Sequence, residues 1–353
     1  MQQQLQQFKD RIASATASKT ALRIKGSGTK DWYGQSLQGE VLDTSAYSGI
    51  IEYDPTELVI TARAGTTLRE IGKALSEKNQ MLAFEPPRFD GMATIGGIIA
   101  SGLSGPRRMA VGSARDFVLG AVLMDGKGEV LHFGGQVMKN VAGYDVSRLL
   151  AGSMGTLGLM LEVSVKVLPR PFAQHSLVFD LSEQEALHQV NLWGGQPLPI
   201  SATSWHDGQL AVRLSGAQAA VDAAIKKMGG AELANADAYW DSLREQSHAF
   251  FADAGQGIWR LSVPSIAPAS KLGGEQLIEW GGAQRWLKTT ADAASIRAAA
   301  IEAGGHATLF KGGDKSVGVF QPLQPALARI HHNLKNTFDP AGIFNPGRMY
   351  PDF

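Results

Sequence analysis

One short loop near the start of the chain has the composition of an anion-binding site. It follows a strand-like run and consists of Lys25, Gly26, Ser27, Gly28 and Thr29. Successive backbone N–H groups in such a loop can converge on phosphate oxygens, and glycine allows the ligand to come close. The loop is not a Rossmann fingerprint, because Asp31 stands where the third glycine should be, and the chain has no P-loop motif.

A second stretch, residues 94–118, combines five glycines with apolar residues such as Ile98 and Ile99. A surface loop does not need these isoleucines, and so many glycines weaken a helix. We therefore predict a buried, folded-back segment whose backbone approaches another group closely. Taken alone, the stretch is also compatible with a glycine-rich turn region of a large enzyme.

The composition limits the chemistry that this chain can perform. Its 353 residues suffice for about two domains, and its 33 basic residues balance 33 acidic ones, so no net field favours nucleic acid or an anionic membrane. Because cysteine is absent, the chain cannot itself hold a disulfide, a cysteine-ligated zinc ion or an iron–sulfur cluster. Electrons would have to pass through an organic cofactor.

Two compartment signals are also missing from the sequence. The N-terminal residues lack the basic and apolar pattern of a secretory signal, and no apolar run approaches the roughly 18 residues of a membrane span. We expect a cytoplasmic protein that contacts a membrane only through a partner.

Periodicity and turn residues predict helices and strands in both halves of the chain. Helices are predicted near residues 5–12, from Thr67 onwards, and over 217–228, 291–303 and 323–334. Strands are predicted over 20–24, 58–64, 117–124, 129–133, 159–168, 176–181, 201–205 and 210–214. The double proline at Pro169 and Pro171 is the best boundary between two domains.

Four segments together resemble the vanillyl-alcohol oxidase/p-cresol methylhydroxylase (PCMH) flavoproteins. They are residues 23–30, 94–118, 152–158 and the Asn-Pro-Gly-Arg sequence at 345–348. The resemblance implies an α+β chain with a two-subdomain PCMH-type FAD-binding domain at 1–170. A smaller α+β cap domain would follow at 171–335, and the tail at 336–353 would return to complete the FAD site.

The resemblance also implies which residues contact FAD. The first loop, Lys25 to Thr29, would hold the diphosphate. The adenosine and isoalloxazine would be surrounded by Pro86, Thr94, Gly97, Ser101, Gly112, Ser113, Asp116 and Val118. Family position adds Gly155, Gly158, Asn345 and Val163, the last on the strand behind the adenine. Some of these glycines could instead pack sheets together.

Three departures from the family pattern qualify this expectation. Lys30 and Asp31 occupy the place of the family's flavin-linking histidine, so we expect noncovalent FAD. Met154 replaces a glutamate of the glycine turn. The histidine-rich metal signature of relatives that oxidise D-2-hydroxy acids is missing, so no metal site is predicted.

Two further groups could act on a substrate. We keep His306 as the candidate catalytic group beside the flavin, with a turn histidine as the alternative. The arginines at 107 and 108 could orient the cofactor or a carboxylate, although a solvated loop suits them better.

Within the family, residues 139–145 and 304–310 are similar to the FAD-binding subunit of glycolate oxidase, also called glycolate dehydrogenase. This similarity implies oxidation of glycolate to glyoxylate in a complex with a second FAD-containing subunit and an iron–sulfur subunit. The complex would be cytoplasmic or peripheral at the inner membrane. Two alternatives stay open: a self-sufficient FAD-dependent 2-hydroxy acid dehydrogenase, and a structural flavin-binding subunit without turnover.

Overall fold

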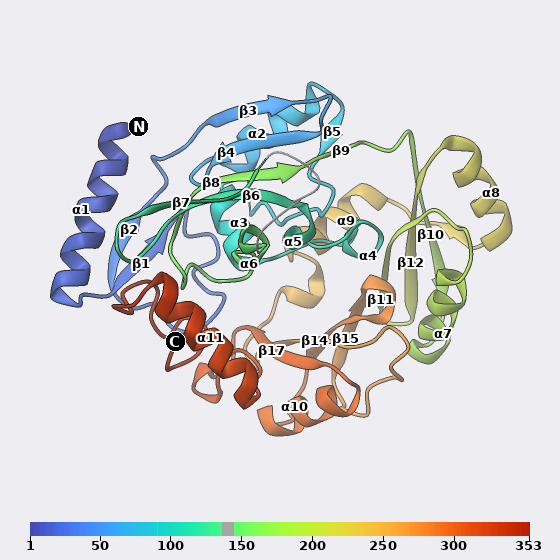
Figure 1. Ribbon diagram of the computed structural model, residues 1–353. Helices are drawn as coiled ribbons and strands as arrows, with labels where there is room; N and C mark the ends of the chain where they lie inside the picture. Colours follow the sequence, from blue (N-terminus) through green and yellow to red (C-terminus); the bar gives the residue numbers. More distant parts are fainter. Residues whose placement is uncertain (90, 136–144) are drawn as a thin grey trace. The chain divides into compact units, whose positions relative to one another are not determined.

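The computed structural model describes residues 1–89, 91–135 and 145–353, which form two compact units (Figure 1). The first unit contains residues 1–103, 113–169 and 322–353, and the second contains 104–112 and 170–321. The chain enters the second unit briefly at residues 104–112 and again at residue 170, within the double proline. The final helix, predicted within the cap domain, belongs to the first unit. Each unit is described separately below.

A five-stranded antiparallel sheet forms the centre of the first unit. Its order is β3 (Ile50–Asp54), β4 (Val59–Arg63), β8 (Leu159–Lys166), β6 (Val118–Met124) and β7 (Val130–Gly134). Side chains on both faces of the central strand β8 are buried, as expected for a covered strand. Short helices accompany the sheet: α2 (Leu68–Ser76), α3 (Ile95–Ser101), α5 (Ala114–Phe117) and α6 (Val146–Leu149). A small antiparallel pair joins β5 (Gln80–Met81) to β9 (Leu168–Pro169).

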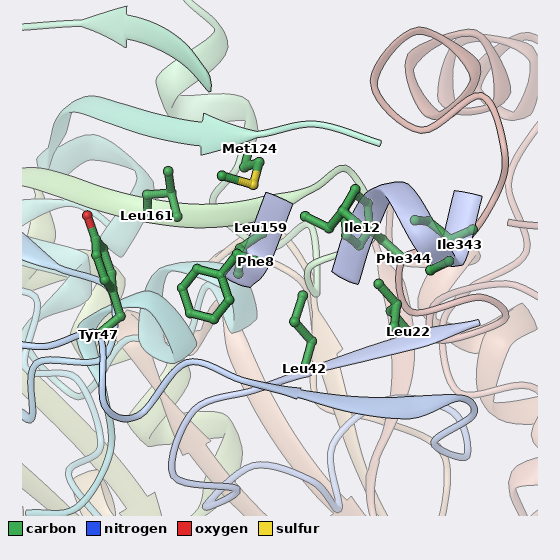
Figure 2. Close-up of a cluster of buried hydrophobic side chains, with 11 residues drawn as sticks. Phe8, Ile12, Leu22, Leu42, Tyr47, Met124, Leu159, Leu161, Ile343 and Phe344 are labelled. Atoms are coloured by element: carbon green, nitrogen blue, oxygen red, sulfur yellow. The ribbon is translucent and has the colours of Figure 1, made fainter. Parts of the chain in front are cut away.

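A separate parallel pair, β1 (Leu22–Lys25) and β2 (Glu40–Asp43), carries the first glycine loop. The apolar face predicted for the first helix, α1 (Gln2–Ser18), is buried here through Phe8 and Ile12. Figure 2 shows these two side chains beside residues of the strands and of the C-terminal tail, Ile343 and Phe344. This hydrophobic cluster fixes the tail against β1, so that the two ends of the sequence help to build one region.

The second unit contains an eight-stranded antiparallel sheet. Its order is β13 (Ala231–Glu232), β10 (Ala173–Asp180), β12 (Gln209–Gly216), β11 (Ile200–His206), β15 (Glu275–Glu279), β16 (Gln284–Lys288), β14 (Ile258–Ser262) and β17 (His306–Lys311). Its helices are α4 (Arg108–Val111), α7 (Glu183–Gly194), α8 (Gln218–Met228), α9 (Ala236–Glu245) and α10 (Ala293–Glu302). No helix in the described part of the chain has both the length and the apolar character needed to cross a bilayer.

The structure corrects the prediction that residues 94–118 avoid helical structure. Residues 95–101 form α3, and the segment continues as two further short helices, α4 and α5. The expected close approach is present, because a Cβ atom on Gly96 would lie 2.6 Å from that of Ala64. The glycines cost the helix stability but let its first turn lie directly against β4.

Candidate cofactor site

Nine of the residues predicted to bind a cofactor line one pocket of the first unit. They are Lys25, Gly26, Ser27, Gly28, Thr29, Thr94, Gly97, Ser101 and Asn345. Their elements are distant in sequence: the loop after β1, the helix α3 and the C-terminal tail. The pocket also includes residues that the sequence did not single out as ligands: Ile24, Lys30, Asp31, Leu37, Ala100, Met154 and Arg348.

The loop at 26–29 has the form of a cradle for oxygen atoms. A Cβ atom on Gly26 would lie 2.5 Å from Thr94 Oγ1, and Gly28 has a φ of +76°, so both positions need glycine. Within the described residues, we find no hydrogen bond from the backbone N–H groups of residues 26–29 to the protein. Backbone donors are usually satisfied, so this loop fits an anionic ligand that would accept from them.

Helix α3 presents small side chains to the pocket. Thr94 caps the helix by accepting a hydrogen bond from Gly97 N at 3.3 Å. Gly97, Ala100 and Ser101 line the pocket from one side of the helix, as spacings of three and four residues require. A large side chain at these positions would fill the pocket.

The tail residue Asn345 connects three parts of the site. Its Oδ1 accepts from Ile24 N at 2.8 Å, and its Nδ2 donates to Met154 O at 2.6 Å. Asparagine tolerates the left-handed backbone found here, with a φ of +41°. Gly155 allows the contact, since a Cβ atom there would lie 2.7 Å from Asn345 Nδ2. The Asn-Pro-Gly-Arg sequence therefore holds the pocket together.

A buried ion pair at the end of the last helix was not anticipated from the sequence. Lys335 Nζ donates to Asp339 Oδ2 at 2.7 Å, to Thr156 O at 2.7 Å and to Phe344 O at 2.8 Å. The Asp339 side chain is fully buried and also accepts from the backbone N–H groups of Ile343 and Phe344. Burial lowers the pKa of Lys335, against the opposing effect of Asp339. We call Lys335 and Asp339 the tail clamp.

Besides Lys25, two cationic side chains line the pocket, Lys30 and Arg348. The Lys30 ammonium donates to Thr29 Oγ1 at 3.0 Å and lies 5.6 Å from the centre of the Phe89 ring. Burial lowers the pKa of Lys30 to about 8, although the negative charge of Asp31 acts in the opposite direction. The buried Arg348 guanidinium donates to the carbonyls of Gln35, Lys30 and Asp31. Burial also lowers its pKa, to about 10.

The other predicted ligands do not line this pocket. Ser113 and Asp116 bond to each other: the Asp116 carboxylate accepts from Ser113 N and Oγ, both at 2.8 Å, at the start of α5. Pro86 is buried, and Gly112 ends α4 in the second unit. Val118 and Val163 are buried in the sheet. Gly155 and Gly158 lie in the second glycine turn, residues 152–158.

The second unit contains the other candidate groups. His306 is the exposed first residue of β17, and partial desolvation together with the charges of Arg260 and Arg108 lowers its pKa. The guanidinium of Arg108 lies 4.2 Å from the Trp280 ring centre, and Arg107 is buried with Nη2 3.1 Å from Gln174 Oε1. The expected solvated loop is therefore wrong for Arg107.

Two predictions from the sequence concern features outside this pocket: the segment at 139–145 and the absence of a metal site. The segment 139–144, part of the stretch similar to glycolate oxidase subunits, lies outside the described residues. Across the described ranges, no three histidine, aspartate or glutamate side chains gather in a way that could hold a metal ion.

Comparisons with known proteins agree with this architecture. Residues 3–134 match the family model described as an FAD binding domain. The chain is 51% identical over 343 residues to the glycolate oxidase subunit GlcE of Escherichia coli K12, covering 97% of this chain and 96% of that protein. It is 35% identical over 158 residues to the glycolate oxidase subunit GlcD of Bacillus subtilis, covering 44% of this chain and 33% of that protein.

Solved structures confirm the predicted fold class. The crystal structure of p-cresol methylhydroxylase with substrate bound has a TM-score of 0.71 and covers 99% of this chain and 87% of its own, at 16% identity. At that identity the likeness shows the fold alone. The PCMH-type α+β fold and the resemblance stated from the sequence are therefore confirmed.

Proposed function

Because the chain belongs to the family of the glycolate oxidase subunit GlcE, we propose that it is the FAD-binding subunit of a multisubunit enzyme that oxidises glycolate to glyoxylate. One observation carries the proposal beyond similarity: nine residues predicted as cofactor ligands line a single pocket. That pocket has positive side chains and N–H groups with no partner among the described residues, as a dinucleotide diphosphate requires.

The residues present fit FAD held without a covalent bond. The backbone of residues 26–29 would bind the diphosphate, and the small side chains of α3 would leave room for the rest of the cofactor. Among the described pocket residues there is no histidine, and the sequence has no cysteine, so neither common flavin-linking side chain is available. Asn345 would act indirectly, by fixing β1 and the second glycine turn.

FAD, when bound, accepts electron pairs from a substrate and passes electrons on to other carriers. This chain has no cysteine ligands for an iron–sulfur cluster, so its electrons must leave to another molecule. We propose a second FAD-containing subunit and an iron–sulfur subunit as the partners, with substrate oxidation mainly in the second flavin subunit. The complex would be cytoplasmic, with any inner-membrane contact made by its partners.

A self-sufficient dehydrogenase is the second candidate, and one observation favours it. The charges of Arg108 and Arg260 both act on His306, within the second unit. Two guanidinium groups could bind a carboxylate, and the neighbouring imidazole could accept a proton from a hydroxyl group. In this case His306 would be the catalytic base of the chain itself.

Anaerobic mixing with glycolate separates the two candidates. The purified chain should bind FAD and show its visible absorption bands, and these should bleach only when the proposed flavin partner is added. Bleaching in the isolated chain would support the self-sufficient dehydrogenase instead. A protein that stays without FAD after incubation with the cofactor would contradict both.

A further inference from the structure

The cations that contact the pocket are not equivalent. The guanidinium of Arg348 is already committed to three backbone carbonyls. Lys25 is the last residue of β1, at the start of the loop, and its charge acts on Asp43. Lys30 differs from Arg348 because its hydrogen bonding leaves most of its donor capacity unused, and it differs from Lys25 because burial withdraws its ammonium from water and lowers its pKa.

Lys30 is a three-donor group with one hydrogen-bond partner. Within the described residues its ammonium donates only to Thr29 Oγ1, and no carboxylate lies within ion-pair distance of it. The Phe89 ring, 5.6 Å away, offers a weak additional attraction. A partly buried cation in this state loses hydration without a full replacement.

The position of Lys30 directs the unused donors towards the pocket. Its Nζ lies 3.5 Å from the place that a Cβ atom would take on Gly97, in the first turn of α3. Lys30 therefore occupies the space between the 26–29 loop and α3, where the N–H groups of the loop have no partner in the described part of the chain. An anion bound by the loop would come within reach of this ammonium.

We propose that the Lys30 ammonium is the charge partner of the cofactor's diphosphate, so that FAD binding is coupled to protonation of this side chain. The inference rests on the proposed FAD site, and it adds a positioning residue for the diphosphate together with a pH dependence. The diphosphate replaces the hydration that Lys30 loses on folding, and the lysine neutralises charge that the backbone loop alone cannot neutralise.

The neighbouring charges set the direction of the pH effect. In the protein without cofactor, burial holds the pKa of Lys30 at about 8, with Asp31 as the opposing charge; Lys25 and Arg348 are the other charged groups that line this pocket. A dianion beside Nζ raises that pKa. Binding above pH 8 must therefore take up a proton, and FAD affinity must fall as the pH rises.

The test is a titration of the cofactor-free protein with FAD at pH 6.5 to 9.5, followed by flavin fluorescence and calorimetry. Above pH 8 the Kd should rise with a slope approaching about tenfold per pH unit. Calorimetry in two buffers of different ionisation enthalpy should show uptake of roughly half a proton at pH 8, increasing towards one at pH 9.

Four variants isolate the group responsible. Lys30→Met should weaken FAD binding at pH 7 by about tenfold to a hundredfold and abolish the slope. Lys30→Arg should keep binding at high pH without a slope, because arginine stays charged. Lys25→Met should keep the slope whatever its effect on affinity. Lys73→Met, on the exposed surface of α2, is the matched control and should change neither.

The outcomes separate this inference from the proposed function. No FAD binding at any pH by folded wild-type protein would overturn the proposed function. Tight binding with a flat pH profile, or a Lys30→Met variant that keeps the wild-type slope, would overturn the Lys30 assignment alone. The circular dichroism spectrum of cofactor-free Lys30→Met checks folding, and its thermal midpoint should not fall, since the substitution removes a poorly solvated charge.

Discussion

Two lysines of the first unit are withdrawn from water in different ways. Among the described residues, Lys335 meets a carboxylate and two carbonyls, while Lys30 meets a single hydroxyl group. Burial lowers the pKa of both, but only Lys335 has partners that replace its hydration. The first arrangement stabilises a fold, and the second leaves binding capacity for a ligand. The contrast suggests that a buried cation indicates a ligand-binding site when the protein supplies too few hydrogen-bond partners for it.

The largest effect is expected from breaking the tail clamp. Asp339→Asn would leave the Lys335 charge buried without its counter-ion and should lower the free energy of unfolding by about 3–5 kcal/mol. Urea unfolding of the cofactor-free protein measures this change. FAD binding should weaken as well, because the clamp fixes Phe344 beside Asn345.

An exposed ion pair of the same unit provides the control for that experiment. Arg11 and Glu40 lie 3.5 Å apart with side chains 43% and 68% exposed, so Glu40→Gln should cost less than about 1 kcal/mol. Equal losses in Asp339→Asn and Glu40→Gln would show that the clamp is no more important than a surface pair. That result would contradict the conclusion that the fully hydrogen-bonded Lys335 stabilises the fold.

The second prediction concerns the cradle itself. Gly26→Ala would bring a methyl group to 2.5 Å from Thr94 Oγ1, and this clash must displace the loop or move the Thr94 side chain from its capping position on α3. FAD affinity should fall by about a hundredfold, an effect comparable to losing one or two charge-assisted hydrogen bonds. A fluorescence titration measures it.

Gly72→Ala is the matched control for Gly26→Ala. Nothing lies within 4 Å of a Cβ atom at Gly72, which is exposed on α2, so the substitution should leave FAD affinity unchanged and stabilise the helix by up to about 1 kcal/mol. A Gly26→Ala variant that binds FAD like the wild type would remove the loop from the proposed site.

The third prediction follows the pH dependence of stability without cofactor. The folded pKa of Lys30, about 8, is below the 10.5 of the unfolded chain, so the unfolded state binds more protons between these values. Stability from this group should therefore rise with pH, by about 1–2 kcal/mol between pH 8 and 9.5. The difference between wild type and Lys30→Met in urea unfolding isolates it; a constant difference over this range would contradict a lowered pKa.

Local patterns made much of the first unit predictable. The spacing of Phe8 and Ile12 gave α1, and Thr67 does cap α2 by accepting from Glu70 N. Such signals depend on residues three or four positions apart, which secondary structure brings together by itself. The composition of the 26–29 loop likewise predicted a cradle without knowledge of the fold.

The features that could not be predicted depend on long-range contacts. The tail clamp joins Lys335 to Thr156, which is 179 positions away, and no local pattern indicates that pairing. Lys30 was noted only as a replacement for a histidine, since its burial becomes evident only after α3 packs beside the loop. The helix α11 (Pro325–Phe338) has the predicted periodicity, but periodicity does not say which unit it joins.

The smallest expected effect tests two residues predicted to contact FAD that do not line the pocket. Asp116 accepts two hydrogen bonds from Ser113 at the start of α5, which accounts for its charge without a cofactor. If helix capping is its whole role, Asp116→Asn should cost about 1 kcal/mol of stability and change FAD affinity less than threefold. Ser113→Ala should give the same pattern in urea unfolding and FAD titration. A loss of affinity above tenfold in folded Asp116→Asn would instead show that this carboxylate, like the Lys30 ammonium, retains capacity for a ligand.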